Sequence, residues 1–132
     1  MITAKSRAQT YLTEITNGPV EIFADVAAEK GGSGKAFRPH QLLCASLASC
    51  LNITVRMVLE RKAIAYDEVV VHVDLDQTVT EKTRFIYDVD IVGVSAQDKE
   101  LVLRIVSTCP VKETLARPME FYRKDDEGDQ RE

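Results

Sequence analysis

Hydrophobic and polar residues alternate along two stretches in the middle of the chain, a pattern typical of β-strands that bury one face. In the first stretch the alternating apolar residues are Val69, Val71, Val73 and Leu75. In the second they are Phe85, Tyr87, Val89 and Ile91. Polar residues stand between them, and the polar segment 77–82 separates the two stretches. The pattern predicts a β-hairpin with one buried and one polar face.

A second hairpin is predicted nearer the N-terminus, around Asn17 and Gly18. Asn-Gly favours a type I′ turn, because that turn needs positive φ at both central residues. Alternation predicts a strand over 20–26, and its partner strand falls within 7–16 in a register that the pattern leaves open. The polar, Gly-rich segment 27–37 is predicted to be an exposed, mobile loop.

The most apolar run of the chain, 42–55, carries no charge and lies inside a predicted helix over 39–62. Pro39 suits the first turn of a helix, where its missing N–H would lack an intrahelical partner. Small or apolar residues fall on every side, so we expect this helix to be buried all round, by its own sheet or by a second subunit. The run of about 14 residues is shorter than the roughly 20 that a membrane span needs. It predicts a core helix and no membrane partner.

Two shorter helices are predicted after the central hairpin. Ser95 with Asp98 three residues on resembles an N-terminal cap. The apolar side of the helix that follows would consist of Leu101, Val102, Ile105 and Val106. Pro110 disfavours helical geometry at Cys109, so this helix should end there and a short one should restart over 111–116.

The order of the predicted elements indicates an α+β fold with a mainly antiparallel sheet, a long central buried helix and a second helix pair. A last strand is predicted over 118–122. It would close a single domain over 1–122, and the charged tail 123–132 is expected to be disordered. A chain of 132 residues, 45% of them hydrophobic, can build one ordinary core but not two.

Composition narrows the function classes. A net charge of -4 without a basic cluster argues against a nucleic-acid partner. The three cysteines form no even disulfide framework, and the first residues lack the apolar core of a secretory signal. We therefore expect a cytoplasmic protein with reduced thiols. The two histidines have no ligand spacing to the cysteines, so no metal is predicted. GGSGK fails the phosphate-loop pattern because Glu29 stands where the first glycine is required, so no nucleotide cofactor is predicted.

The cysteines are the best candidates for chemistry. Cys44 and Cys50 lie about 9 Å apart along one helix axis and face different sides. They cannot form a disulfide while the helix is intact, since that needs Cα atoms within about 7 Å. Cys109 is the remaining intramolecular partner for either, and it precedes a helix start whose free N–H groups favour a thiolate. No helix neighbour of Cys50 is basic, so the residues alone leave open whether it is reactive or an inert core cysteine.

Two sequence motifs, taken together and in their order, resemble the signature of a known protein family. PHQLLCASLASCLNITVRMVLERK over 39–62, followed by CPVKETL over 109–115, resembles the signature of the OsmC/Ohr family of hydroperoxide-reducing proteins. In that family a Pro-led helix with a central cysteine is followed by a β-hairpin and a Cys-Pro-Val helix start, and the match spans about 10–122. The resemblance implies the OsmC-like fold and an intertwined homodimer with its sites at the interface.

The resemblance also implies a cysteine-based peroxidase. Cys50 would be the peroxidatic residue, which attacks the peroxide as a thiolate and becomes a sulfenic acid. Cys109 would be the resolving residue, forming a disulfide that a dithiol reductant reopens, of lipoyl type in the best studied branch. Organic hydroperoxides would be favoured over hydrogen peroxide. Cys44 matches no catalytic position and is expected to be structural.

The chain departs from the family at one position, which suggests a divergent branch. Well-characterised branches carry a glutamate immediately after the motif proline and an arginine further upstream, which together activate the cysteine. His40 occupies the glutamate position and becomes a candidate supporting residue, although a solvated histidine is the simpler interpretation. The candidates for the basic residue are Arg38, which is nearest the motif, Lys35, Lys30 and Arg7. Two alternatives stay open: a non-catalytic protein that binds a small hydrophobic ligand in the dimer cleft, and a thiol redox sensor.

Overall fold

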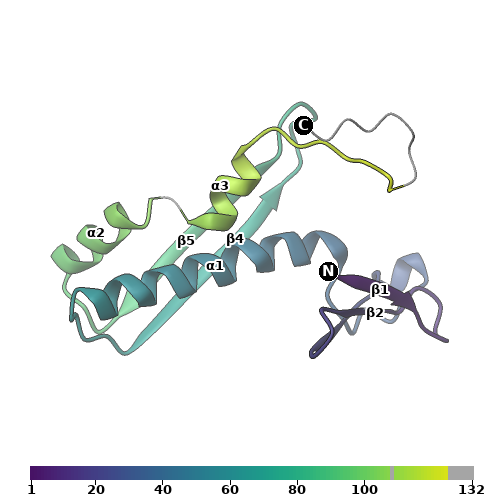
Figure 1. The fold of residues 1–132 in the computed structure, drawn as a ribbon, viewed down its shortest axis with the longest axis horizontal. Coiled ribbons are helices and arrows are strands. Elements are labelled where there is room, and N and C mark those ends of the chain that lie inside the picture. Colours follow the sequence, from purple (N-terminus) through teal and green to yellow (C-terminus); the bar gives the residue numbers. More distant parts are fainter. Residues whose placement is uncertain (108, 125–132) are drawn as a thin grey trace.

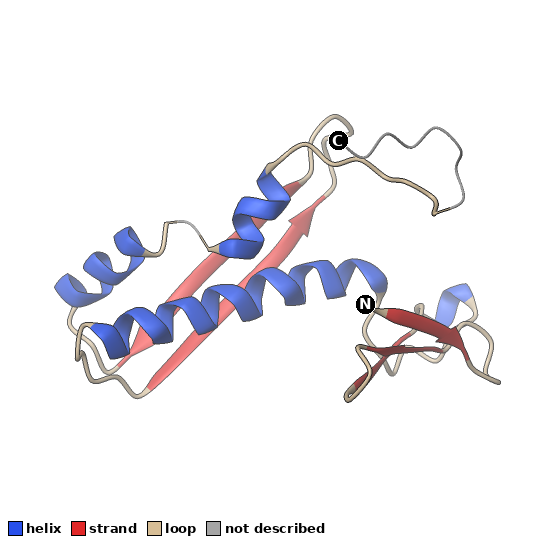
Figure 2. Ribbon diagram, in the orientation of Figure 1, coloured by secondary structure: helices blue, strands red, loops and turns tan. Residues whose placement is uncertain are grey.

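The computed structural model describes residues 1–107 and 109–124 and has an elongated α+β architecture (Figures 1 and 2). A three-stranded sheet lies at the N-terminal end of a long helix, α1. Along the rest of its length, α1 packs against a two-stranded hairpin and two short helices. The elements are β1 Thr3–Ser6, β2 Thr13–Thr16, β3 Glu21–Ala24, a 3₁₀ turn Ala28–Lys30, α1 Pro39–Arg61, β4 Glu68–Asp76, β5 Arg84–Val92, α2 Ala96–Ile105 and α3 Pro110–Ala116. All strand pairs in the two sheets are antiparallel, which confirms the predicted fold class.

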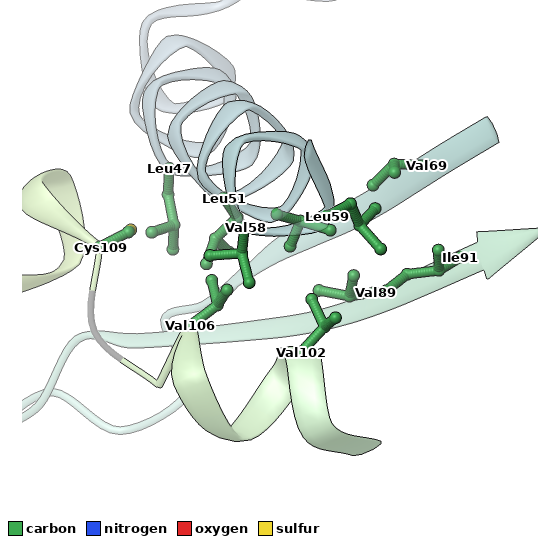
Figure 3. Packing of buried hydrophobic residues seen from close by; sticks show 11 residues of the cluster. Leu47, Leu51, Val58, Leu59, Val69, Val89, Ile91, Val102, Val106 and Cys109 are labelled. Atoms are coloured by element: carbon green, nitrogen blue, oxygen red, sulfur yellow. The ribbon is translucent and has the colours of Figure 1, made fainter. Parts of the chain in front are cut away.

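The β4–β5 hairpin has the predicted pairing of apolar residues. Val69 lies opposite Ile91, and Val71 lies opposite Val89. These residues therefore share one face, which packs against α1 (Figure 3). The opposite face is polar: His72, for example, pairs with Asp88, and both are exposed. The alternation read from the sequence thus places the correct face inside.

The main core lies between α1 and this hairpin, and α2 and α3 close it (Figure 3). The buried residues of α1 are Leu47, Leu51, Val55, Val58 and Leu59. Val102, Val106 and Cys109 complete the core from the other side. Leu101 and Ile105, which were expected on the apolar side of α2, are instead 40% and 43% exposed. The helix packs through Val102 and Val106. The prediction is therefore confirmed for these two residues and wrong for Leu101 and Ile105.

Helix α1 is buried on one side, not all round. Leu43, Ile53 and Met57 are 42%, 44% and 54% exposed, and their spacing places them along one stripe of the helix. By length and composition, with a mean hydropathy of 1.8, α1 could also cross a membrane. Because its other side packs on β4, α2 and α3, we interpret it as a core helix whose outer stripe is uncovered in one protomer.

The N-terminal sheet, in the order β1-β2-β3, contains one strand that the sequence pattern did not predict, β1. Its second turn also differs from the expected type I′ geometry. Gly18 has a φ of +113°, but Asn17 does not adopt positive φ, and four residues close the turn because Thr16 pairs with Glu21. Pro19 explains the difference, since it has no N–H to close a two-residue loop.

The Gly-rich segment after β3 is exposed, as predicted, but it is fastened at its centre by a buried carboxylate. Asp25, 4% exposed, accepts hydrogen bonds from the Ser33 hydroxyl at 2.6 Å, the Ser33 N–H at 2.9 Å and the Val26 N–H at 2.8 Å. The Ser33 hydroxyl bond, followed by these N–H bonds, lowers the pKa of Asp25. A Cβ on Gly32 would meet the Val26 carbonyl oxygen at 2.1 Å, so this close approach requires glycine.

The last predicted strand, 118–122, is wrong: this segment forms no strand within the described residues. Met119, Phe121 and Tyr122 are 52%, 90% and 52% exposed. The segment has apolar and aromatic residues that favour a strand, but within the described part of this protomer it pairs with no sheet edge. Residues 125–132 of the tail that was expected to be disordered lie outside the described residues, and the domain boundary at 122 stays a prediction.

Candidate redox site

Cys50 lies in the middle of α1, at the border between the core and the uncovered stripe. It is half-buried and packs against the core cluster. Leu47 and Leu51, which flank it on the helix, are both 2% exposed. The thiol is therefore held by well-packed neighbours and keeps access to the surface.

Cys109 caps the N-terminus of α3 and is 1% exposed. Its backbone is extended, with φ of -116° and ψ of 158°, because the following proline disfavours the helical region. Val111 and Lys112 follow it in the first turn of α3, whose leading N–H groups have no partner within the helix. Figure 3 shows this side chain at the end of the core cluster, beside Leu47.

The fold brings these two cysteines together. Cys109 belongs to the buried core cluster against which Cys50 packs, although 59 positions separate them in the sequence, and both are free thiols. Burial raises the pKa of Cys109, and the neighbouring Cys50 adds to this rise, whereas the N–H groups of Val111 and Lys112 oppose it. The helix start therefore acts to lower the pKa of this thiol, as the sequence suggested, but burial outweighs its effect and favours the protonated thiol.

Cys44 lies apart from this pair. It is half-buried beside a cavity of about 550 Å³ near the N-terminal end of α1, which Asp74 of β4 also lines. Burial, followed by the negative charge of Asp74, raises the pKa of this thiol. Both effects disfavour a thiolate at Cys44.

His40 and Arg38, the candidate supporting residues, line this same cavity. His40 precedes Cys50 by ten residues on one helix, which corresponds to about 15 Å along the axis, and Arg38 is about 18 Å away. Neither side chain therefore supports Cys50 of its own protomer. The other basic candidates lie no closer in sequence, and Arg7 forms an ion pair with Glu14 at 2.5 Å.

Sequence reasoning missed one interaction beside Cys109. The Lys112 ammonium donates hydrogen bonds to the Ser107 carbonyl oxygen at 2.7 Å and to the Tyr87 hydroxyl at 3.2 Å. It also lies 5.4 Å from the centroid of the Tyr87 ring. A lysine three residues after the Cys-Pro motif was the available signal, but its partner on β5 is 25 residues distant and could not be chosen from spacing alone.

A small cavity of about 270 Å³ lies beside the site, between α1, β5 and α2. Its apolar lining consists of Leu51, Val89, Leu103 and Val106, with the more polar side chains Tyr87, Asp88 and Lys99. Within 1–107 and 109–124, no group of three or more His, Cys, Asp or Glu side chains is placed to hold a metal ion.

Comparison with known proteins gives a consistent result. The family described as OsmC-like protein matches residues 32–122, which include both cysteine motifs. A search of curated proteins gives no match.

Several solved structures share the fold. A putative osmotic stress induced and detoxification response protein from Psychrobacter arcticus is 19% identical, with 86% of this chain and 85% of that chain covered and a TM-score of 0.69. An organic hydroperoxide resistance protein from Legionella pneumophila is 24% identical, with 88% of each chain covered and a TM-score of 0.60. The organic hydroperoxide resistance protein OhrB of Bacillus subtilis is 22% identical, with 88% and 89% covered and a TM-score of 0.60. At these identities the likeness establishes the fold alone.

Proposed function

Because the chain belongs to the OsmC-like family, we propose that it is a thiol peroxidase that reduces organic hydroperoxides, and hydrogen peroxide less well, to alcohols or water. The observation that carries this proposal is that a half-buried Cys50 packs against the core cluster to which the buried Cys109 belongs. The similar structures described as organic hydroperoxide resistance proteins support the substrate class.

The reaction uses the two thiols in sequence. The Cys50 thiolate attacks the terminal oxygen of the hydroperoxide, the O–O bond breaks, and the alkoxide takes a proton and leaves as an alcohol. Cys50 is then a sulfenic acid. The Cys109 sulfur displaces its hydroxyl group, so that an S–S bond forms, the S–O bond breaks and water leaves. A dithiol reductant, which we propose to be of lipoyl type, reopens the disulfide by thiol exchange and is itself oxidised. No bound cofactor takes part.

The different burial of the two thiols suits this order. Cys50 has access to the surface and can meet a peroxide, whereas Cys109 at 1% exposure cannot. Since burial raises the pKa of Cys109, this thiol holds a proton that it can release when the hydroxide leaves Cys50. Because both side chains pack in the same cluster, the sulfenic acid would form near the group that consumes it.

We also propose that the active form is a homodimer. The uncovered stripe of α1, formed by Leu43, Ile53 and Met57, borders Cys50. A second copy that covers this stripe would shield Cys50 from water. It could also supply His40 and Arg38, which lie too far along the same helix to support Cys50 in cis. A cytoplasmic location and the absence of nucleic-acid and membrane partners stay predictions.

A second candidate function is the binding of a small hydrophobic ligand without catalysis. The partly apolar cavity of about 270 Å³ beside Leu51 and Val106 favours it, as does the histidine in place of the family glutamate. This candidate predicts that the cysteines can be replaced without loss of function.

The peroxidase proposal is tested by turnover of cumene hydroperoxide and hydrogen peroxide with dihydrolipoamide as reductant. The Cys50→Ser variant is expected to lose turnover entirely, because it removes the attacking sulfur. Cys109→Ser should still form one sulfenic acid per chain but no internal disulfide. Cys44→Ser serves as the matched control and should turn over at the parent rate. Absence of turnover in the parent, with all thiols still titratable afterwards, would favour the binding function.

A further inference from the structure

Lys112 holds the chain on both sides of Cys109. Its ammonium donates to the carbonyl oxygen of Ser107, two residues before the cysteine, at 2.7 Å. Lys112 itself lies in the first turn of α3, three residues after the cysteine at the N-cap position. One residue therefore links Ser107, before Cys109, to the helix start that follows Cys109.

The same ammonium joins this helix start to the sheet. It donates to the hydroxyl of Tyr87 on β5 at 3.2 Å and lies 5.4 Å from the centre of that ring. Tyr87 pairs with Val73 of β4, so it belongs to the rigid hairpin that carries the core. Hydrogen bonds that involve a charged donor are the stronger ones in proteins. The first turn of α3, which directly follows Cys109, is thus bound to β5 of the sheet.

We propose that Lys112 is a positioning residue, which holds the Cys109 sulfur against Cys50 and so sets the rate at which the disulfide closes. The proposal rests on the redox function proposed above. Lys112 does not contact the peroxide; it acts through the backbone that carries Cys109. Peroxide attack on Cys50 is therefore independent of it, and closure of the disulfide depends on it.

In the closing step the Cys109 sulfur must approach the sulfenic sulfur on the side opposite its hydroxyl group. The S–S bond forms while the S–O bond breaks, the Cys109 proton leaves with the hydroxide as water, and no further oxidant is required. Small displacements of a reacting group strongly reduce the rate of such a step. Without the Lys112 hydrogen bonds to Ser107 and Tyr87, Cys109 could occupy other positions relative to Cys50.

The experiment measures the two steps separately. The reduced protein is mixed with one equivalent of cumene hydroperoxide, the sulfenic acid is trapped with dimedone at successive times, and the disulfide is quantified by mass spectrometry. We expect Lys112→Met to leave sulfenic acid formation unchanged and to slow closure about tenfold, the effect of removing hydrogen bonds to a charged group. Lys112→Arg, which keeps the cation and its donors, should recover most of the rate.

Arg104→Met is the control, because Arg104 is another exposed cation, and its ion pair, with Glu100 at 3.3 Å, lies within α2 and does not involve α3 or β5. It should close at the parent rate. If Lys112→Met does not fold, Tyr87→Phe removes one acceptor and keeps the ring, and a smaller delay in the same step is expected. Closure at the parent rate in the folded Lys112→Met protein, or in Tyr87→Phe where that variant replaces it, would overturn the proposal.

A second arm separates this proposal from the peroxidase proposal. Diamide, an azo compound that accepts two electrons and two protons from a thiol pair, closes the disulfide without any peroxide. If the parent forms no sulfenic acid with cumene hydroperoxide, the peroxidase function fails, but the diamide rates still decide the role of Lys112. Slower diamide closure in Lys112→Met than in Arg104→Met supports positioning, and equal rates reject it.

Discussion

The two ends of the molecule differ in how completely their alternating apolar residues are buried. Around the second half of α1, the apolar faces of α1 and the β4–β5 hairpin meet, and Leu47, Leu51 and Leu59 are at most 2% exposed. At the N-terminal sheet, Val20 and Ile22 alternate just as regularly but are 60% and 46% exposed. The same periodicity thus gives a core at one end and an uncovered surface at the other. A pattern shows which face must be buried, but it does not show that the covering partner belongs to the same chain.

The largest difference between the two ends is expected when one aliphatic side chain is truncated in each of them. Leu59→Ala removes a side chain that is 0% exposed and should lower the free energy of unfolding by about 2–5 kcal/mol. Ile22→Ala should cost much less in dilute protein. Unfolding by denaturant at several protein concentrations measures both. A large, concentration-independent loss for Ile22→Ala would show that the N-terminal sheet is already buried within one protomer.

The uncovered stripe of α1 provides the next test. Met57→Asp places a charge in the proposed dimer interface, where an unpaired charge is costly to bury. We expect the dimer dissociation constant to rise at least tenfold, by about 1.4 kcal/mol or more, as measured by sedimentation. Ile86→Asp is the control, since Ile86 is 59% exposed on the outer face of β5. The interface assignment fails if the two variants sediment alike, or if the parent is a monomer at all concentrations.

The smallest expected effect concerns the segment fastened by Asp25. The folded pKa of this carboxyl lies below its ordinary value of 3.8. Its stabilising contribution is therefore complete above that value and is lost as the pH falls through the lower folded pKa. Amide hydrogen exchange at Ser33 should accelerate below about pH 3.8, and Asp25→Asn should show faster exchange already at neutral pH. Equal exchange rates in the variant and the parent would show that the Asp25 hydrogen bonds do not stabilise this segment.

Much of the fold could be predicted because its determinants are local. Pro39 and the Ser95 cap mark helix starts whose observed bounds agree with expectation, and the Asp98 N–H does donate to the Ser95 hydroxyl at 3.0 Å. The β4–β5 register follows from strict alternation. The failures involve partners that periodicity cannot identify. They include β1, whose sequence has little alternation, and the strand expected over 118–122, which has no sheet edge to pair with in the described residues.

The candidate site, too, could be predicted only in part from the sequence. Cys50 and Cys109 could be singled out from their settings, but only the fold brings them into contact. Burial, which no local pattern reveals, decides the direction of the Cys109 pKa. The Lys112 and Tyr87 pair depends on the packing of α3 beside β5 and was invisible in the sequence. The separation of His40 from Cys50, in contrast, follows from helix geometry alone.

The most direct test of the account is the identity of the bonds formed when the reduced protein meets one equivalent of cumene hydroperoxide. Peptide mass spectrometry under non-reducing conditions locates the oxidised sulfurs. The account predicts a disulfide between Cys50 and Cys109 in each chain, with Cys44 still a free thiol. Oxidation at Cys44 in place of Cys50, or three unmodified thiols after the peroxide has been present, would contradict it.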